Sequence, residues 1–175
     1  ARKSRGLGDV YKRQIQHLRS LRTIDMSKNN LTEIPDWISD IPLLGRINFS
    51  NNRLSTLPSS LQNLSHLNTL DIPRNLFTEV PPVIRKLTSL KTLDMDRNHI
   101  EELPRWIGEL TSLTGWLSIG CNLITEIPES IGNLTSLQAL YVTDNSLTHL
   151  PESIGNLKSL ETLYVSFNSL SLIHI

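Results

Sequence analysis

The sequence predicts an α/β solenoid in which seven short coils stack side by side and contribute seven parallel strands. An apolar–x–apolar triplet recurs along the chain, and an asparagine stands three residues after each triplet. A proline follows six residues after each of the first six asparagines. The asparagines are spaced by 23 residues, with one step of 24, at Asn29, Asn52, Asn75, Asn98, Asn122, Asn145 and Asn168. Self-similarity at a fixed period of this length is typical of stacked repeat units.

The apolar triplet predicts a short strand, because alternation sends two apolar side chains to the core and the middle one to solvent. Copies of the strand are expected to stack in parallel, about 4.8 Å apart. No single coil buries its own apolar face, so stacking against neighbouring coils supplies most of the stability.

The asparagine and the proline of each repeat have separate expected roles. The asparagine follows the strand where the chain turns, and its amide both donates and accepts, so it can satisfy backbone groups buried by the turn. The proline fixes φ and begins a helical or 3-10 turn. An apolar residue three positions after the proline then returns to the core.

Together these positions resemble the leucine-rich repeat family, in its short intracellular-type form with L-P-x-x-I-G-N-L wording, as in Leu150 to Leu157. The fourth copy shows the pattern in full, with Leu90, Leu93, Met95, Asn98, Ile100, Leu103, Pro104, Ile107 and Leu110. The resemblance extends from about Leu18 to Leu170. It implies a right-handed, curved horseshoe segment with the strands on the concave face and the helical or 3-10 turns on the convex face.

The expected domain organisation is a single leucine-rich repeat domain over residues 15–175, preceded by a segment of different character. Residues 1–14 carry no repeat positions and resemble a translated sequencing adaptor, as do the closing residues SLIHI, so we treat residues 1–14 as non-native. We expect Ala1 to Gln14 to make few contacts with the core. Neither end shows a clear cap, and the seventh repeat is cut short.

One copy departs from the pattern by carrying an extra residue between Leu113 and Leu117. A residue inserted within a strand would turn every later side chain to the wrong face. Leu117 and Ile119 nevertheless recover the register. We therefore expect a bulge or widened turn at Thr114 to Trp116, before the strand, with Trp116 near the concave rim.

Charge and composition argue against several classes of partner. The chain has 17 basic and 17 acidic residues, but residues 1–14 hold five of the basic residues and one of the acidic ones. The remainder therefore has a net charge of −4, which disfavours nucleic acid as a partner. No apolar run reaches the roughly 20 residues needed to span a bilayer, so no membrane association is expected. A single cysteine excludes internal disulfides and favours a reducing, cytoplasmic compartment.

No pattern for catalysis or for a cofactor is found, so we expect a non-enzymatic protein. Phosphate-binding loops, serine nucleophile elbows and paired acid–base carboxylates are missing from the sequence. Asp94, Asp96 and His99 are spaced as potential metal ligands, but no fixed fourth ligand accompanies them. Cys121 has no histidine partner in the register of the repeats.

The candidate binding residues are those that the register places on the outward, concave face of the sheet. Its centre is charged, and its C-terminal part is aromatic: Asp71, Arg74, Asp94, Asp96 and Arg97, then Trp116, Tyr141, Tyr164 and Phe167. Exposed aromatic residues are favoured as binding anchors, yet cross-strand aromatic pairs also stabilise sheets without binding anything. The charged residues are interpreted chiefly as a solvated ladder, in which the arginines compensate the aspartates, with a dedicated polar site as the alternative.

The resulting prediction is a scaffold for signal transduction that binds another protein on its concave sheet, without cofactor. Two alternatives remain open at this point. The repeats could be the targeting arm of a larger enzyme such as a kinase, a GTPase or a ubiquitin ligase. They could also belong to the extracellular part of a receptor. The sequence does not identify the partner.

Overall fold

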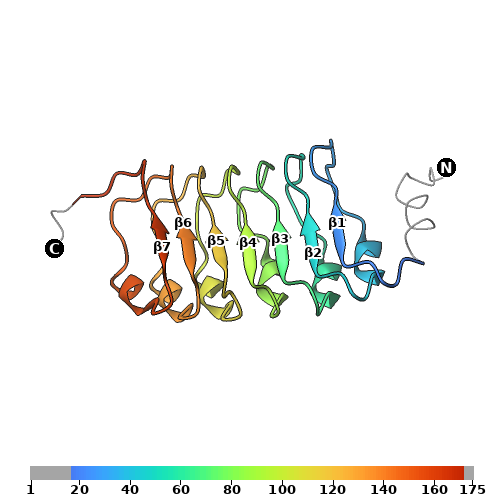
Figure 1. Ribbon diagram of the computed structural model, residues 1–175. Helices are drawn as coiled ribbons and strands as arrows, with labels where there is room; N and C mark the ends of the chain where they lie inside the picture. Colours follow the sequence, from blue (N-terminus) through green and yellow to red (C-terminus); the bar gives the residue numbers. More distant parts are fainter. Residues whose placement is uncertain (1–16, 172–175) are drawn as a thin grey trace.

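The computed structural model describes residues 17–171, which form one row of seven stacked coils (Figure 1). The prediction that Ala1 to Gln14 make few contacts with the core lies outside these residues. Each coil contributes one three-residue strand, and coils are numbered here by their strand. The strands are β1 (Thr23–Asp25), β2 (Arg46–Asn48), β3 (Thr69–Asp71), β4 (Thr92–Asp94), β5 (Trp116–Ser118), β6 (Ala139–Tyr141) and β7 (Thr162–Tyr164).

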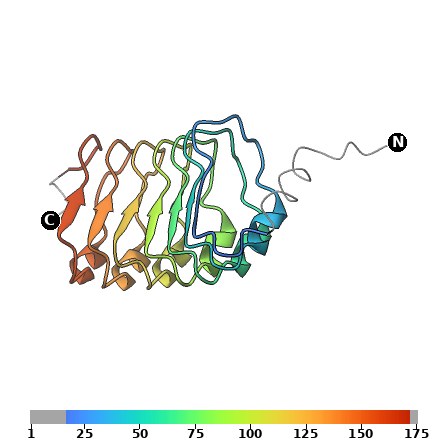
Figure 2. The ribbon, with the colours of Figure 1, turned by 45° about the vertical axis from the view of Figure 1, so that its right-hand side comes forward.

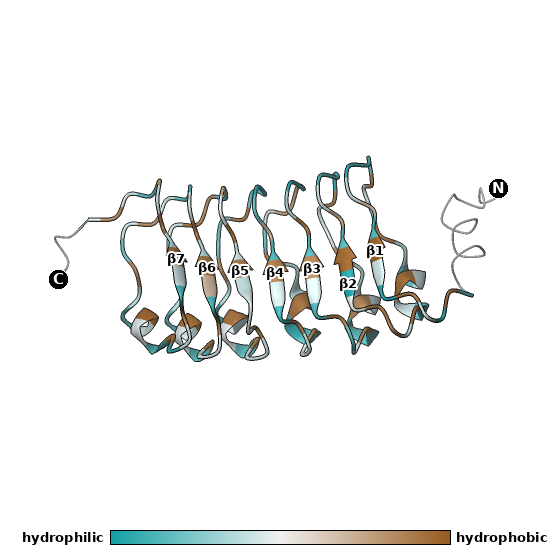
Figure 3. Ribbon diagram, in the orientation of Figure 1, coloured by the Kyte–Doolittle hydropathy of each residue, from teal (hydrophilic) through white to brown (hydrophobic). Residues whose placement is uncertain are grey.

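The strands form one open parallel sheet in the order β1-β2-β3-β4-β5-β6-β7. The first apolar residue of each predicted triplet lies at the middle of a strand. Ile47, Leu70 and Leu93 at this position are completely buried in the core, whereas Leu163 in β7 is 38% exposed. The two neighbours of each middle residue face outward, and we call this outward side the sheet face. Figure 3 shows hydrophobic residues recurring at corresponding places along successive coils, with hydrophilic residues between them.

The proline of each repeat is followed by a 3-10 turn of five residues, which settles the helical or 3-10 alternative (Figure 2). These repeat prolines are Pro35, Pro58, Pro81, Pro104, Pro128 and Pro151. Each proline is the N-cap residue of its turn, because its fixed φ suits the entry and the missing N–H is not needed there. The turns form a second row beside the sheet: η1 (Asp36–Asp40), η2 (Ser59–Asn63), η3 (Pro82–Lys86), η4 (Arg105–Glu109), η5 (Glu129–Asn133) and η6 (Glu152–Asn156).

The asparagines form a continuous ladder through the stack, which confirms their predicted role. Asn75 is representative: its amide nitrogen donates to the carbonyls of Phe49 and Ile72, and its oxygen accepts from the N–H of Leu54, each at 3.0–3.1 Å. Phe49 and Leu54 belong to the preceding coil, so Asn75 joins two coils, whereas among the described residues Asn29 bonds only to Met26 and Ser27 of its own coil. Asn52, Asn98, Asn122, Asn145 and Asn168 repeat this geometry.

The residue before each asparagine has a left-handed backbone conformation, with φ between 52° and 59° in all seven coils. None of the seven is glycine, although this region costs other residues roughly 1–2 kcal/mol. The N–H of Arg97, for example, donates to the carbonyl of Gly120 in the next coil. Corresponding hydrogen bonds between coils support this conformation in the first six coils. The residues are Lys28, Asn51, Arg74, Arg97, Cys121, Asp144 and Phe167.

The extra residue between Leu113 and Leu117 is absorbed before β5, as predicted. Leu117 is completely buried and pairs in register with Leu93, so the alternation of side chains in this strand is the same as in β4. The chain bends at Gly115, whose N–H donates to the carbonyl of Lys91. Trp116 is the first residue of the strand and is 41% exposed.

Candidate functional site

The sheet face carries the nine predicted binding residues, which separate into two groups along the stack. We call Asp71, Asp94 and Asp96 the acidic group, which lies on coils 3 and 4. We call Trp116, Tyr141, Tyr164 and Phe167 the aromatic patch, which lies on coils 5 to 7. Arg74 and Arg97 occupy the left-handed positions beside the acidic group and are exposed.

The structure brings Tyr141 and Tyr164 together as a stacked pair. They face each other in register on β6 and β7, with ring centroids 5.3 Å apart and ring planes at 23°. Cross-strand packing of these two rings is therefore confirmed. Tyr164 still exposes 55% of its surface, which leaves much of the pair open to a partner.

Trp116 and Phe167 lie apart from this pair. Trp116 is in register with Ala139, at the first position of its strand, whereas the tyrosines occupy the third. Phe167 lies beyond β7 and is 80% exposed. Neither residue makes a ring contact with the tyrosines in the part of the chain that the structure describes. The aromatic patch thus consists of a rigid pair and two separate exposed side chains.

The acidic group is less exposed than a solvated ladder of charges would be. Asp71 is buried and forms an ion pair with Arg46, at 2.8 Å between Nη2 and Oδ2. Burial raises the pKa of Asp71, and the guanidinium of Arg46 opposes this effect. Among the described residues, Arg74 and Arg97 form no ion pair with the acidic group.

The expected compensation by Arg74 and Arg97 is therefore wrong for Asp71, whose partner is Arg46 on the neighbouring strand. Sequence reasoning missed Arg46 because it considered the third strand position and the residues beyond it. The first position also points outward, so a diagonal partner on β2 could have been found by including it.

Asp94 is the most perturbed carboxyl of the site. Burial raises its pKa to about 6, with smaller contributions from the negative charges of Asp96 and Asp71. Its oxygen accepts a hydrogen bond from the N–H of Asp96 at 3.0 Å, which partly offsets the effect. Parallel stacking in register places Asp71 and Asp94 directly side by side.

We expect Asp94→Asn to stabilise the fold at neutral pH. Between about pH 4 and pH 6 the folded protein retains a proton on Asp94 that the unfolded chain has released, so the free energy of unfolding falls as pH rises. The variant should gain about 1–2 kcal/mol at pH 7, after allowance for partial solvent screening. The gain should disappear near pH 4, and urea denaturation at both pH values measures it.

Glu161→Gln is the control for this prediction, because it removes one negative charge from an exposed position in coil 7. A gain for Asp94→Asn that is equally large at pH 4 and pH 7 would contradict the assignment to ionisation of Asp94.

Two hydrogen bonds from coil 5 hold the carboxylate of Asp96, which belongs to coil 4. Its Oδ1 accepts from the hydroxyl of Ser118 at 2.7 Å and from the N–H of Gly120 at 2.6 Å. Both donors come from coil 5, whose outward side chains at these positions are small. The carboxylate of coil 4 is thereby brought towards β6. The repeat register alone does not indicate this contact, because the contact depends on the small residues of the next coil.

The geometry supports neither a reactive cysteine nor a metal site among the described residues. Burial, together with a hydrogen bond to Asp144, raises the pKa of the Cys121 thiol, which disfavours the reactive thiolate. Over residues 17–171, no three metal-ligating side chains come together, and His99 is exposed. The same residues include no helix long and apolar enough to cross a membrane.

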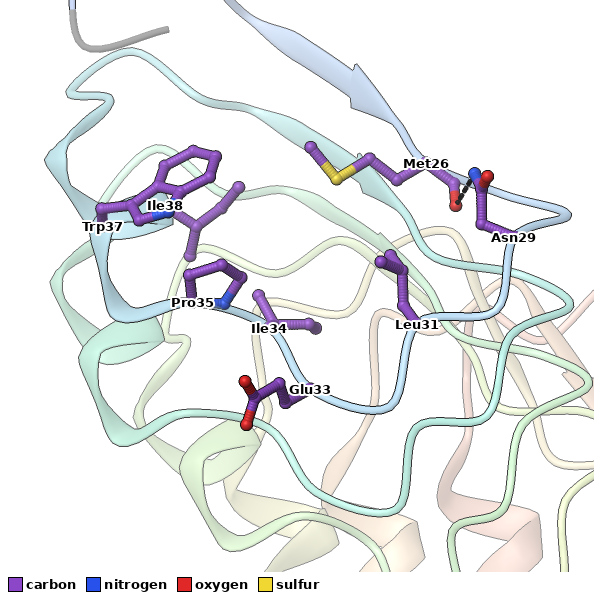
Figure 4. Close-up of a pocket in the computed structure, with 8 residues that line it drawn as sticks. All are labelled: Met26, Asn29, Leu31, Glu33, Ile34, Pro35, Trp37 and Ile38. Atoms are coloured by element: carbon purple, nitrogen blue, oxygen red, sulfur yellow. Dashed lines mark hydrogen bonds between the residues drawn. The ribbon is translucent and has the colours of Figure 1, made fainter. Parts of the chain in front are cut away.

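A cavity of about 200 Å³ lies in coil 1, away from the sheet face (Figure 4). It is mainly apolar, and its lining includes Leu31, Ile34 and Trp37. The position of Leu31 is occupied in coil 2 by Leu54, which is completely buried beneath coil 1. The cavity therefore lies at the apolar core position of coil 1.

Comparison with known proteins agrees with this architecture. The leucine rich repeat model matches residues 2–54 and 114–170, and the leucine-rich repeat region model matches residues 44–121. The chain belongs to the leucine-rich repeat family. The first match begins within residues 1–14, whose non-native origin stays a prediction. A search of curated proteins gives no significant match.

Solved structures with the same fold include bacterial and plant proteins. A leucine-rich repeat protein of Leptospira interrogans is 29% identical, with a TM-score of 0.74, and the match covers 90% of this chain and 46% of that one. The ectodomain of the Arabidopsis thaliana receptor kinase GASSHO1/SCHENGEN3 is 33% identical, with a TM-score of 0.77 and coverage of 90% and 20%. The plant peptide hormone receptor RGFR1 is 30% identical, with a TM-score of 0.76 and coverage of 90% and 30%. The chain thus spans less than half the length of these proteins.

Proposed function

We propose that this chain is a non-catalytic scaffold that binds a peptide or protein partner on its sheet face, mainly at the aromatic patch. Leucine-rich repeat domains commonly mediate protein–protein interaction. The observation that carries the proposal here is the stacked pair of Tyr141 and Tyr164, of which Tyr164 is 55% exposed. Tyrosine is enriched among the residues that dominate binding energy. A preformed sheet also loses little conformational freedom on docking.

The similar structures support a polypeptide partner. The GASSHO1/SCHENGEN3 ectodomain was solved with CASPARIAN STRIP INTEGRITY FACTOR 2, and RGFR1 was solved with RGF2. Both are ectodomains or receptors of plants. For this chain, they favour a peptide or protein over nucleic acid or a membrane surface as the bound species.

A second candidate is that the domain is the recognition arm of a larger protein, either a signalling enzyme or an extracellular receptor. The observation that favours it is that a similar structure is the ectodomain of a plant membrane receptor kinase, GASSHO1/SCHENGEN3. The complete reading frame distinguishes the candidates, because an enzyme domain or a receptor architecture would be visible beside the repeats.

The binding proposal predicts that the aromatic patch supplies most of the affinity. Once a partner has been captured with the intact chain, calorimetry should show that Tyr141→Ala and Tyr164→Ala each weaken binding by more than about 1 kcal/mol. Arg74→Ala should change the association rate and its salt dependence more than the final affinity. Circular dichroism checks that each variant is folded.

Glu152→Ala is the matched control, because Glu152 is exposed on η6 in the row of 3-10 turns. It should bind like the parent chain. Loss of binding for this variant, with normal binding by both tyrosine variants, would place the site on the other side of the solenoid.

A further inference from the structure

The tyrosine pair lies in a part of the solenoid that is poor in positive charge. Within residues 111–171, all of which the structure describes, there are five acidic residues and one Lys or Arg: Glu126, Glu129, Asp144, Glu152, Glu161 and Lys158. The ammonium group of Lys158 donates to the carbonyl of Gly155, at the row of 3-10 turns. No lysine or arginine of coils 5 to 7 is therefore available to the sheet face. In coil 4, Arg97 follows Asp96 in the chain and is exposed, and it forms no ion pair with Asp96 among the described residues.

Asp96 adds a fixed carboxylate next to this aromatic surface. The two hydrogen bonds from coil 5 orient its Oδ1, and no hydrogen bond to its Oδ2 is formed by the described residues. Ser118, one of the donors, is in register with Tyr141 on the adjacent strand. Adjacent strands lie about 4.8 Å apart. The carboxylate and the phenol ring thus lie on neighbouring positions of one rigid sheet.

This combination selects a cation by two separate effects. The face of an aromatic ring attracts an ammonium or guanidinium group through its quadrupole. A carboxylate that is already oriented forms a charge-assisted hydrogen bond with the same group. A neutral glutamine side chain can donate to the carboxylate, but it lacks the positive charge that the ring face attracts. A negatively charged side chain would gain neither interaction and would be repelled by Asp96.

We propose that the sheet face of coils 4 to 7 binds a partner segment that presents an arginine or lysine side chain between Asp96 and the Tyr141–Tyr164 pair. This inference rests on the proposed function, because it names the chemical class of partner for the same surface. The apolar residues beside the cation would contact the remaining aromatic patch. Because Asp96 and the acidic residues of coils 5 to 7 are negatively charged, the complementary partner is a basic polypeptide segment.

Three nine-residue peptides test the inference with the intact chain labelled with ¹⁵N. They share the sequence Ser-Gly-X-Phe-Gly-X-Phe-Gly-Ser, where X is arginine, glutamine or glutamate. In NMR titrations the arginine peptide should shift the amide signals of Ser118, Gly120 and Thr143. Its affinity should exceed that of the glutamine peptide by roughly fivefold, and the glutamate peptide should bind weakest.

Two variants assign the selectivity to the named residues. Asp96→Asn keeps an oxygen that accepts from Ser118 and Gly120 but removes the charge. Tyr141→Leu keeps apolar bulk but removes the ring. Each should reduce the preference for the arginine peptide over the glutamine peptide, whereas Glu129→Gln on η5 should leave it unchanged.

The possible results distinguish this inference from the proposed binding function on which it rests. Equal affinity of the three peptides, with shifts at Ser118 and Gly120, would overturn the preference for a cation and leave binding at the sheet face intact. Shifts confined to the row of 3-10 turns would overturn both. An arginine peptide that produces no shifts would also overturn the inference, whereas the function would still be tested by the captured partner.

Discussion

Replacing Asn75 with leucine should lower the free energy of unfolding by about 2–4 kcal/mol, one of the two largest effects expected in this chain. Asn75 is 4% exposed and lies between coils 2 and 3. Leucine would leave the N–H of Leu54 without its hydrogen-bond acceptor, and it would remove one donor each from the carbonyls of Phe49 and Ile72. Urea denaturation followed by circular dichroism measures the loss.

Asn68→Leu is the matched control, since it makes the same chemical change at an exposed position that precedes β3. The side chain of Asn68 accepts one hydrogen bond, from the hydroxyl of Thr69, its neighbour in the chain. The change should stay within about 0.5 kcal/mol, as is usual for surface substitutions. Equal denaturation midpoints for the two variants would refute the role assigned to the buried asparagine ladder.

Gly108→Ala should have an effect of similar size, about 2–4 kcal/mol, for a steric reason. A Cβ at this position would overlap the backbone carbonyl oxygen of Ser130 and lie 2.8 Å from its carbonyl carbon. Both obstructing atoms are backbone, so η4 and η5 would have to separate. Gly132 faces Ser153 of the following coil in the same way.

Gly155→Ala provides the comparison at the same position of the P-x-x-I-G segment. No atom lies within 4 Å of a Cβ built at Gly155, and its φ is not positive. Alanine there should be neutral or stabilise by up to about 1 kcal/mol, because it restricts the unfolded chain. If both variants lose the same stability, the close approach of the 3-10 turns does not explain the glycine at position 108.

The sequence by itself determined the fold class, the register and the role of the asparagines. Those predictions rest on periodicity, because a repeat of 23 residues fixes which side chains of successive coils become neighbours. The extra residue near Trp116 was placed correctly for the same reason, since Leu117 and Ile119 had to return to the core. The adjacency of Tyr141 and Tyr164 also followed from the register.

Only the tertiary structure decided how the outward residues interact. Asp71 pairs with Arg46 rather than with Arg74, and Asp96 of coil 4 accepts hydrogen bonds from Ser118 and Gly120 of coil 5. These contacts depend on side-chain length, on the direction of each backbone turn and on the size of residues in the next coil. Periodicity specifies the neighbours of a residue, but hydrogen bonding and desolvation determine which of those neighbours it binds.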